Sequence, residues 1–288
     1  MVNHKINKLP KNTLEITVEI SPDEIEKEYQ KTFDILNKEL SVQGFRKGKV
    51  PKAIAEKHLS KESVYQELLR TLIPRIYREI VKKEGLKPVV SPKIELVKAK
   101  EKESWQILIK VAEKPVVILG EYKKAIKEAK EAQKKDDIWV PGKDKTKPEA
   151  KEKDNSQVLN IVLAELLKKT KCEISNLIVE SEVEQRLARM VDDIQKIGLT
   201  VEAYLKSKNI TVDQLKNQYR REIEDTYKLE FILSEIADKE DIKVEPFEID
   251  KLFANIKEEK ERAAAKANSY FYAMLLRKQK TLDFLIGL

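Results

Sequence analysis

The sequence predicts two domains of different class: an α+β domain with an antiparallel sheet and two long helices in residues 1–115, then an all-α domain in residues 157–288. Near both ends of the first region apolar residues alternate with polar ones, which is the period of a half-buried strand. Beyond residue 157 they recur every three or four positions, which is the helical period. With 288 residues, 41% hydrophobic content and only seven glycines, the chain can form two largely helical cores.

Two alternating segments predict the strands of the first domain. Their apolar positions are Leu14, Ile16, Val18 and Ile20 in the first segment and Trp105, Ile107, Ile109 and Val111 in the second. Each segment has one apolar and one polar face, as an antiparallel strand has when one side of the sheet is covered. We therefore expect a sheet that brackets the first domain.

Two long helices are predicted between these strands. Ser21 and Glu24 have the spacing of a capping box, and Pro22 stands at the first helical position. Apolar residues then follow at helical spacing, namely Ile25, Tyr29, Phe33, Leu36 and Leu40. The second helix carries two neighbouring stripes, Val64, Leu68, Leu72, Ile76 and Ile80 beside Tyr65, Leu69, Ile73 and Tyr77.

Residues 116–156 predict a charged linker between the domains. Lys, Glu, Asp, Ala and Pro dominate their composition, and Trp139 is the one large aromatic residue after Tyr122. Such a composition cannot bury enough apolar surface to form a core of its own, although its start is compatible with a helix.

Apolar periodicity and capping residues predict the helices of the second domain. Gly198 follows a stripe that we assign to the core, at the position of a left-handed cap, and Thr211 with Gln214 forms a capping box. Pro246 opens a further helix. The stripes are Val183, Leu187, Met190, Ile194 and Ile197; Leu215, Tyr219, Ile223, Tyr227 and Phe231; and Ile249, Leu252, Phe253 and Ile256.

One loop stands out chemically, the octapeptide of residues 44–51, which follows the first helix. It places Phe45 between Gly44 and Gly48 beside three cations, Arg46, Lys47 and Lys49, and ends at Pro51. Small neighbours give the aromatic ring little to pack against, and the cations repel one another without an acidic partner. The loop thus predicts a contact surface, and the alternative is a connection whose Phe enters its own core. A phosphate-binding P-loop is excluded, because only three residues separate the glycines and Val50 follows Lys49.

Charge and composition limit the function. Basic residues exceed acidic ones by 24 to 17 in residues 1–115 but not in residues 157–288, where the counts are 22 and 24. The first domain is therefore expected to dock on an anionic surface such as nucleic acid, unless this excess is only a solvated face. No segment approaches the roughly 20 apolar residues of a membrane span.

The residues of catalytic chemistry are scarce, and we predict no catalytic residue, metal site or cofactor. His4 and His58 lie far apart and lack further ligands at metal-site spacing. The single cysteine, Cys172, excludes an internal disulfide and has no histidine beside it, so we expect it to fill space on a helix face in a cytosolic, soluble protein.

The octapeptide, its position after the first helix, and the closing residues 276–285 (LRKQKTLDFL) together resemble the trigger factor family of ribosome-associated bacterial chaperones. The Gly-Phe-Arg-x-Gly-x-x-Pro pattern is complete from Gly44 to Pro51. Residues 179–183 and Tyr204-Leu205 are similar to the family's carboxy-terminal domain, but these motifs are less specific. The resemblance implies that residues 1–115 are a ribosome-binding domain and residues 157–288 a client-binding domain.

The resemblance implies an ATP-independent chaperone that docks on the large ribosomal subunit at the tunnel exit, through ribosomal protein and rRNA. It would shield apolar segments of nascent or unfolded polypeptides in the cytoplasm, and whether the free protein forms a homodimer is left open. Phe45, Arg46 and Lys47 match the family's ribosome-contacting triplet. For clients we select a segment more apolar than one helix face requires, with core packing as the alternative: Tyr270, Phe271, Tyr272, Met274 and Leu275.

The chain departs from the family pattern in residues 116–156. Usual members carry an inserted peptidyl-prolyl isomerase domain of the FK506-binding type at this place, about a hundred residues long. The interval here contains Trp139 and Gly142 but no alternating strands, so we predict that the isomerase domain and its activity are absent. The segment between Ile256 and Tyr270 also looks short for the family's helical arm.

Two other functions remain open. A basic RNA-binding or ribosome-assembly protein without client activity would explain the charge, and it would bind naked RNA whether or not Phe45 is present. A purely structural helical scaffold would leave the octapeptide without a role.

Overall fold

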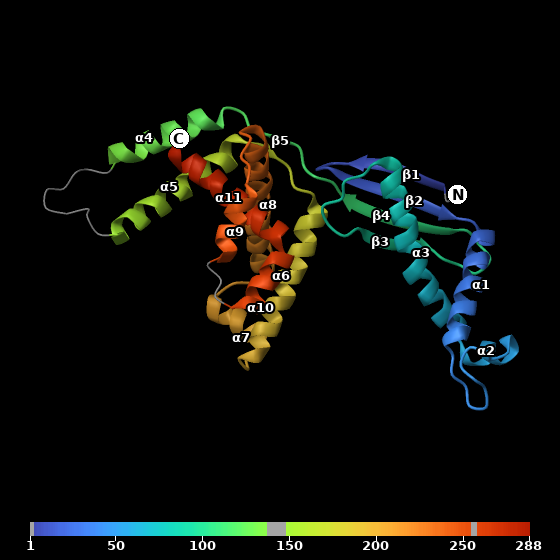
Figure 1. Ribbon diagram of the computed structural model, residues 1–288. Coiled ribbons are helices and arrows are strands. Elements are labelled where there is room, and N and C mark those ends of the chain that lie inside the picture. Colours follow the sequence, from blue (N-terminus) through green and yellow to red (C-terminus); the bar gives the residue numbers. More distant parts are fainter. Residues whose placement is uncertain (1–2, 137–147, 255–257) are drawn as a thin grey trace. The chain divides into compact units, whose positions relative to one another are not determined.

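A computed structural model describes residues 3–136, 148–254 and 258–288, together with the side chains of these residues except 133–136 and 148–156. The chain divides into two compact units, Met1–Lys114 and Pro115–Leu288 (Figure 1). Each unit encloses its own buried apolar side chains, such as Ile16 in the first and Ile236 in the second.

The first unit is built on a four-stranded antiparallel sheet in the order β1-β2-β4-β3. Both predicted strands are confirmed and lie next to each other at its centre, with Ile16 opposite Ile109. The two outer strands were not predicted, because an edge strand buries less and its sequence alternates less clearly. The strands are β1 (Asn3–Leu9), β2 (Thr13–Ile20), β3 (Lys93–Lys98) and β4 (Trp105–Ala112).

Three helices accompany this sheet, α1 (Pro22–Glu39), α2 (Lys52–His58) and α3 (Lys61–Glu84), and the long α1 and α3 contact each other. The Ser21 hydroxyl accepts a hydrogen bond from the backbone N–H of Glu24, which confirms the predicted cap of α1. Four residues of the first stripe of α3, Leu68, Leu72, Ile76 and Ile80, are buried against the sheet, and the neighbouring stripe is half-buried beside them. A second, smaller cluster under α2 joins Phe33, Val50, Ala55 and Val64.

The second unit is largely helical, but not entirely so. Two short strands, β5 (Val117–Ile118) and β6 (Lys171–Cys172), pair antiparallel, so Cys172 lies buried on a strand and not on the predicted helix face. The central α8 contacts α5, α6 and α11. The helices are α4 (Tyr122–Asp136), α5 (Pro148–Lys169), α6 (Asn176–Lys196), α7 (Val201–Lys208), α8 (Val212–Lys239), α9 (Pro246–Ala254), α10 (Glu259–Ala267) and α11 (Ser269–Gly287).

The described part of the interval 116–156 differs from the predicted linker. Helix α4 packs against α5, with Tyr122 and Ile126 buried. The Tyr122 hydroxyl donates to Glu240 at 2.8 Å, and the Lys123 ammonium reaches the same carboxylate at 2.6 Å. Burial and this hydrogen bond raise the pKa of Tyr122 well above its usual range, and the Lys123 contact lowers the pKa of Glu240. The high charge content of this interval led us to predict no core there, although Tyr122 and Ile126, one helical turn apart, are both buried.

The two helix caps predicted in the second unit are both present in the structure. Gly198 follows α6 with φ of +75°, as a left-handed cap requires, and both hydrogen bonds of the Thr211–Gln214 capping box are present. Trp139, Gly142 and Ile256 lie outside the described residues. Among the helices that the structure describes, none is long and apolar enough to cross a membrane.

Candidate functional site: the basic loop and the uncovered apolar surfaces

The basic loop of residues 44–51 connects α1 to α2 and forms a tip of the first unit, away from the sheet (Figure 1). Gly44 and Gly48 have φ of +91° and +77°, a region that side chains with a Cβ rarely adopt. Two turns shape the loop, with the Phe45 N–H donating to the Val42 carbonyl at 3.0 Å and the Lys49 N–H to the Arg46 carbonyl at 2.9 Å. Pro51 is the N-cap residue of α2.

The base of the loop is closed by a polar bond and an apolar plug. Asn37, in the last turn of α1, donates through Nδ2 to the carbonyl of Val50 at 3.2 Å. The Val50 side chain is buried in the small cluster with Phe33 and Ala55. A Cβ added to Gly48 would stand 3.2 Å from the Lys38 carbonyl oxygen, so the second half of the loop passes very close to the backbone of α1. These contacts fix both ends of the loop.

The side chains at the tip stay uncovered. Phe45 is 39% exposed and belongs to neither core cluster of the first unit, which is contrary to the alternative that it enters its own core. Arg46, Lys47 and Lys49 are exposed, and within the described chain none of them forms an ion pair with a carboxylate. The tip therefore combines one aromatic ring with three cations that lack acidic partners.

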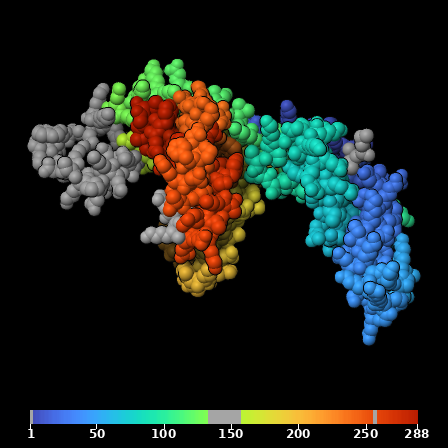
Figure 2. Space-filling view, viewed as in Figure 1, coloured from blue at the N-terminus to red at the C-terminus, as the bar shows by residue number. Residues whose placement is uncertain are grey.

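A second uncovered surface lies at the start of α11. Tyr270, Phe271, Met274 and Leu275 are between 52% and 79% exposed, so they do not form the core that was the alternative for this segment. Tyr272 differs, because it is half-buried with its ring edge-on to Phe253 at 5.3 Å. We call the four exposed residues the α11 patch. In Figure 2 the orange and red surface of the last helices is not covered by other parts of the chain on the face turned to the viewer.

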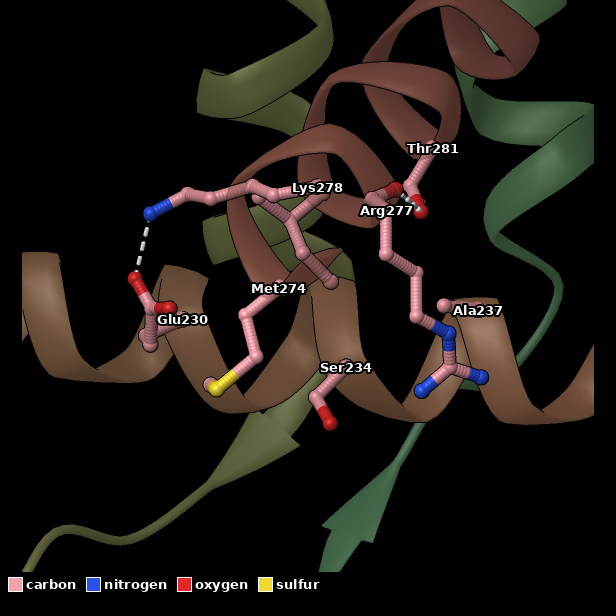
Figure 3. A pocket seen from close by; sticks show the side chains of 8 residues that line it. Glu230, Ser234, Ala237, Met274, Arg277, Lys278 and Thr281 are labelled. Atoms are coloured by element: carbon pink, nitrogen blue, oxygen red, sulfur yellow. Dashed lines mark hydrogen bonds and ion pairs between the residues drawn. The ribbon is translucent and has the colours of Figure 1, made fainter. Parts of the chain in front are cut away.

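A pocket between α8 and α11 is lined by Met274 of the patch and by the charged side chains of Glu230, Arg277 and Lys278 (Figure 3). Met274 lies near Ser234 of α8, Arg277 lies beside Ala237, and Lys278 pairs with Glu230. The Arg277 guanidinium donates to the Ile242 carbonyl at 2.8 Å and to Asp238 at 2.7 Å. Charged contacts therefore hold the middle of α11 in place while the four side chains of the α11 patch remain exposed.

A third surface was missed by the sequence analysis, which assigned the Met190 stripe to the core. Val183 and Ile194 are buried, but Met190 is half-buried and Ile197 is 69% exposed. The stripe continues beyond the part of α6 that α8 covers, so helical periodicity alone could not separate core from surface. Met190, Ile194 and Ile197 line an open groove together with Tyr204 of α7 and Tyr219 of α8.

The family follows from comparison with known proteins. Residues 2–139 match the family described as bacterial trigger factor protein (TF), and residues 143–286 match the one described as bacterial trigger factor protein (TF) C-terminus. The chain belongs to the trigger factor family. Its predicted membership is thus confirmed along nearly the whole sequence.

Individual members of the trigger factor family are related to parts of the chain. Trigger factor of Streptococcus pneumoniae (strain Hungary19A-6) is 40% identical over 108 residues, which are 38% of this chain and 25% of that protein. Trigger factor of Desulforudis audaxviator (strain MP104C) is 36% identical over 116 residues, 40% of this chain and 26% of that protein. The aligned part thus spans about a quarter of these relatives' length.

A solved structure shares the fold over both units. It belongs to the work titled "Promiscuous Substrate Recognition in Folding and Assembly Activities of the Trigger Factor Chaperone", and covers 99% of both chains with a TM-score of 0.62 and 16% sequence identity. At this identity the likeness concerns the fold alone.

The described residues of this trigger factor chain offer little for bond-making chemistry. No group of three or more His, Cys, Asp or Glu side chains among them could hold a metal ion. Burial raises the pKa of the Cys172 thiol, which disfavours the nucleophilic thiolate. His4 contacts Glu84 at 3.0 Å and joins the edge strand β1 to the end of α3.

We expect Asn37→Ala to loosen the loop without unfolding the first unit. A net hydrogen bond contributes about 1 kcal/mol, so loss of the bond to Val50 should speed hydrogen exchange at the Phe45 and Lys49 amides about fivefold. Exchange measured by mass spectrometry checks this, with the exposed Asp34→Ala on the same helix as the control. Unchanged exchange in Asn37→Ala would show that the bond does not hold the loop.

Proposed function

We propose that this chain is an ATP-independent chaperone that docks on the ribosome through the basic loop and shields apolar segments of nascent polypeptides with its second unit. The observation that carries the proposal is the loop itself: in a trigger factor chain, Phe45 stands at an exposed tip beside three cations that pair with no carboxylate in the part of the chain that the structure describes. We place the protein in the cytoplasm, partly bound to the large ribosomal subunit at the tunnel exit.

Docking would use two kinds of contact. The Arg46 guanidinium suits a carboxylate of a ribosomal protein, with the Phe45 ring inserted beside it, whereas Lys47 and Lys49 suit phosphates of rRNA. Because the cations are solvated, their attraction weakens as salt rises. An affinity near micromolar, about −8 kcal/mol, would allow the protein to cycle on and off.

Holding would rely on apolar burial in the second unit. A fully exposed Phe, Leu or Met side chain forgoes about 1.5 to 3 kcal/mol that burial would provide, so three such residues beside Tyr270 in the α11 patch are unfavourable unless something covers them. Unfolded clients offer matching apolar segments. The flexible methionine side chain adapts to varied shapes, which suits weak binding of many sequences without an energy source.

We also propose that the chain lacks peptidyl-prolyl isomerase activity. The two family matches are separated by residues 140–142 alone, which leaves no room between them for a domain of about a hundred residues. This observation supports the absence of the inserted domain from the interior of the chain.

The second candidate is a basic RNA-binding or ribosome-assembly protein that holds no clients. The unpaired cations of the loop favour it, but the α11 patch would then have no use.

Replacing Phe45, Arg46 and Lys47 together by Ala should weaken ribosome binding at least tenfold, because the triple variant removes the ring and two cations at once. Co-sedimentation with bacterial 70S ribosomes at low and high salt measures this. The control replaces one exposed apolar residue and two exposed cations away from the loop, Ile35, Lys82 and Lys83. Binding that falls with salt but is equal in both variants would instead favour the general RNA binder.

Replacing Phe271, Met274 and Leu275 by Ser should raise several-fold the protein concentration needed to keep a denatured test protein from aggregating, since the variant removes apolar contact area. Light scattering follows the aggregation, and circular dichroism checks the fold. The control carries Ser at three comparably exposed apolar positions elsewhere, Ile35, Val116 and Ile118. Equal loss in both variants would remove the α11 patch from the proposed function.

The purified chain should not accelerate cis/trans isomerisation of a proline peptide above the uncatalysed rate. The uncatalysed reaction takes roughly tens to hundreds of seconds at 25 °C. A protease-coupled assay on a short peptide measures the rate. Acceleration that rises in proportion to the protein and survives further purification would contradict the proposed loss of isomerase activity.

A further inference from the structure

The described methionines of this chain lie outside its cores. Of the three methionines, Met1 lies outside the described residues, and the other two are Met190 and Met274. Met274 is 52% exposed in the α11 patch, and Met190 is half-buried in the open groove that Tyr204 also lines. Methionine usually fills gaps in a core, where solvent does not reach its sulfur. Dissolved oxidants can therefore reach both thioethers, and they reach that of Met274 more easily.

The single thiol of the chain is protected from the same oxidants. Cys172 is buried on β6, and burial raises the pKa of its thiol. Peroxides attack the thiolate, so a buried and protonated thiol reacts slowly. Mild oxidation of the described chain is thus expected to begin at a thioether.

Met274 lies beside hydrogen-bond donors that the thioether does not use (Figure 3). Its side chain extends from α11 toward α8 and ends between Glu230 and Ser234 in this view. Within the described chain, the Ser234 hydroxyl forms no hydrogen bond. Lys278 lines the same pocket and pairs with Glu230, which leaves further N–H donors on its ammonium group. A hydroxyl and an ammonium group are thus available to a new acceptor at this place.

The sulfoxide of methionine would be such an acceptor. Its oxygen accepts hydrogen bonds strongly, whereas thioether sulfur accepts them weakly. The open volume of the pocket is about 70 Å³, more than one added oxygen atom needs. Glu230 does not exclude the group, because a sulfoxide is neutral and Lys278 already pairs with this carboxylate.

We infer that Met274 is a reversible oxidation site, at which a peroxide converts the thioether to a sulfoxide and thereby weakens the holding of clients by the α11 patch. The inference rests on the proposed client-holding function and adds a control to it. The oxidised side chain turns into the pocket, where Ser234 and Lys278 donate to the new oxygen. The α11 patch then loses one of its four apolar members.

The chemistry balances with hydrogen peroxide as the oxidant. A lone pair of the sulfur forms the S–O bond while the O–O bond breaks, and the second oxygen leaves as water after taking up the proton of the first. The sulfur is oxidised by two electrons, and the peroxide is reduced. Methionine sulfoxide reductases reverse the change with a thiol reductant, so the modification can act as a switch.

The test treats the full chain with hydrogen peroxide, removes the peroxide with catalase, and then adds a denatured test protein. Mass spectrometry of peptides follows each sulfoxide, and light scattering follows aggregation. Met274 should be oxidised several-fold faster than Met190, because it is more exposed. The oxidised chain should need about threefold more protein for the same suppression, since one apolar contact of the α11 patch has become polar. Reductase treatment should restore the original value.

Two variants of similar side-chain volume separate this site from other lesions. Met274→Leu keeps the α11 patch apolar and cannot form a sulfoxide there, so it should hold clients equally well before and after peroxide. Met190→Leu is the matched control and should lose holding as the wild type does. Circular dichroism checks the fold of each protein before and after treatment.

A third variant tests the pocket. In Ser234→Ala the sulfoxide oxygen lacks its hydroxyl donor, so the side chain should return to solvent more often. A mixture of two reductases, one for each sulfoxide epimer, should then repair Met274 several-fold faster than in the wild type. An equal rate of repair would show that Ser234 does not hold the oxidised side chain.

Several results would overturn the inference. If Met274 is fully converted to the sulfoxide and holding is unchanged, the inference fails while client holding stands. A loss of holding that also occurs in Met274→Leu would assign the effect to another residue. If the untreated chain does not suppress aggregation, the proposed holding function fails and the inferred control fails with it. Oxidation of Met274 no faster than that of Met190 would contradict the reactivity expected from its exposure.

Discussion

Three cations of α11, together with the buried Leu285, fix this helix to the rest of the second unit. Arg277 bonds to the carbonyl of Ile242 and to Asp238, Lys280 bonds to the Lys243 carbonyl at 2.7 Å and to Glu248 at 2.9 Å, and Lys278 pairs with Glu230. Because these polar contacts hold the middle of the helix, its first turns do not need to pack against the core. Four apolar side chains can then stay in solvent without the helix collapsing onto the core.

The basic loop follows the same logic at a smaller scale. Asn37 and the buried Val50 hold the base of the loop, so Phe45 at the tip is presented rather than buried. In both units a satisfied polar contact fixes the backbone, and an apolar group that would otherwise be buried remains available. Such exposure is unfavourable in a free protein and favourable once a partner covers it, which is the energetic pattern of a binding surface.

Sequence patterns predicted the parts of the fold in which burial is regular. The central strands β2 and β4 and the long helices α1 and α3 were found because one face of each is wholly apolar. The edge strands β1 and β3 were not, since half-exposed strands carry mixed side chains. Helix α4 was not predicted as part of a core, because most of its residues are charged. The contact of Tyr122 with Glu240 joins residues 118 positions apart, so no local sequence pattern predicts it. Helical periodicity likewise could not show that the Ile197 side chain is exposed although it continues a core stripe.

The central claim is that one chain docks with its loop and holds clients with its second unit at the same time. A photo-crosslinking amino acid in place of Phe271, tested on stalled ribosome–nascent chain complexes, examines both parts together. The account predicts crosslinks to the emerging chain that disappear when Phe45, Arg46 and Lys47 are replaced by Ala. Crosslinks of equal yield without the loop residues, or none with the loop intact, would contradict it.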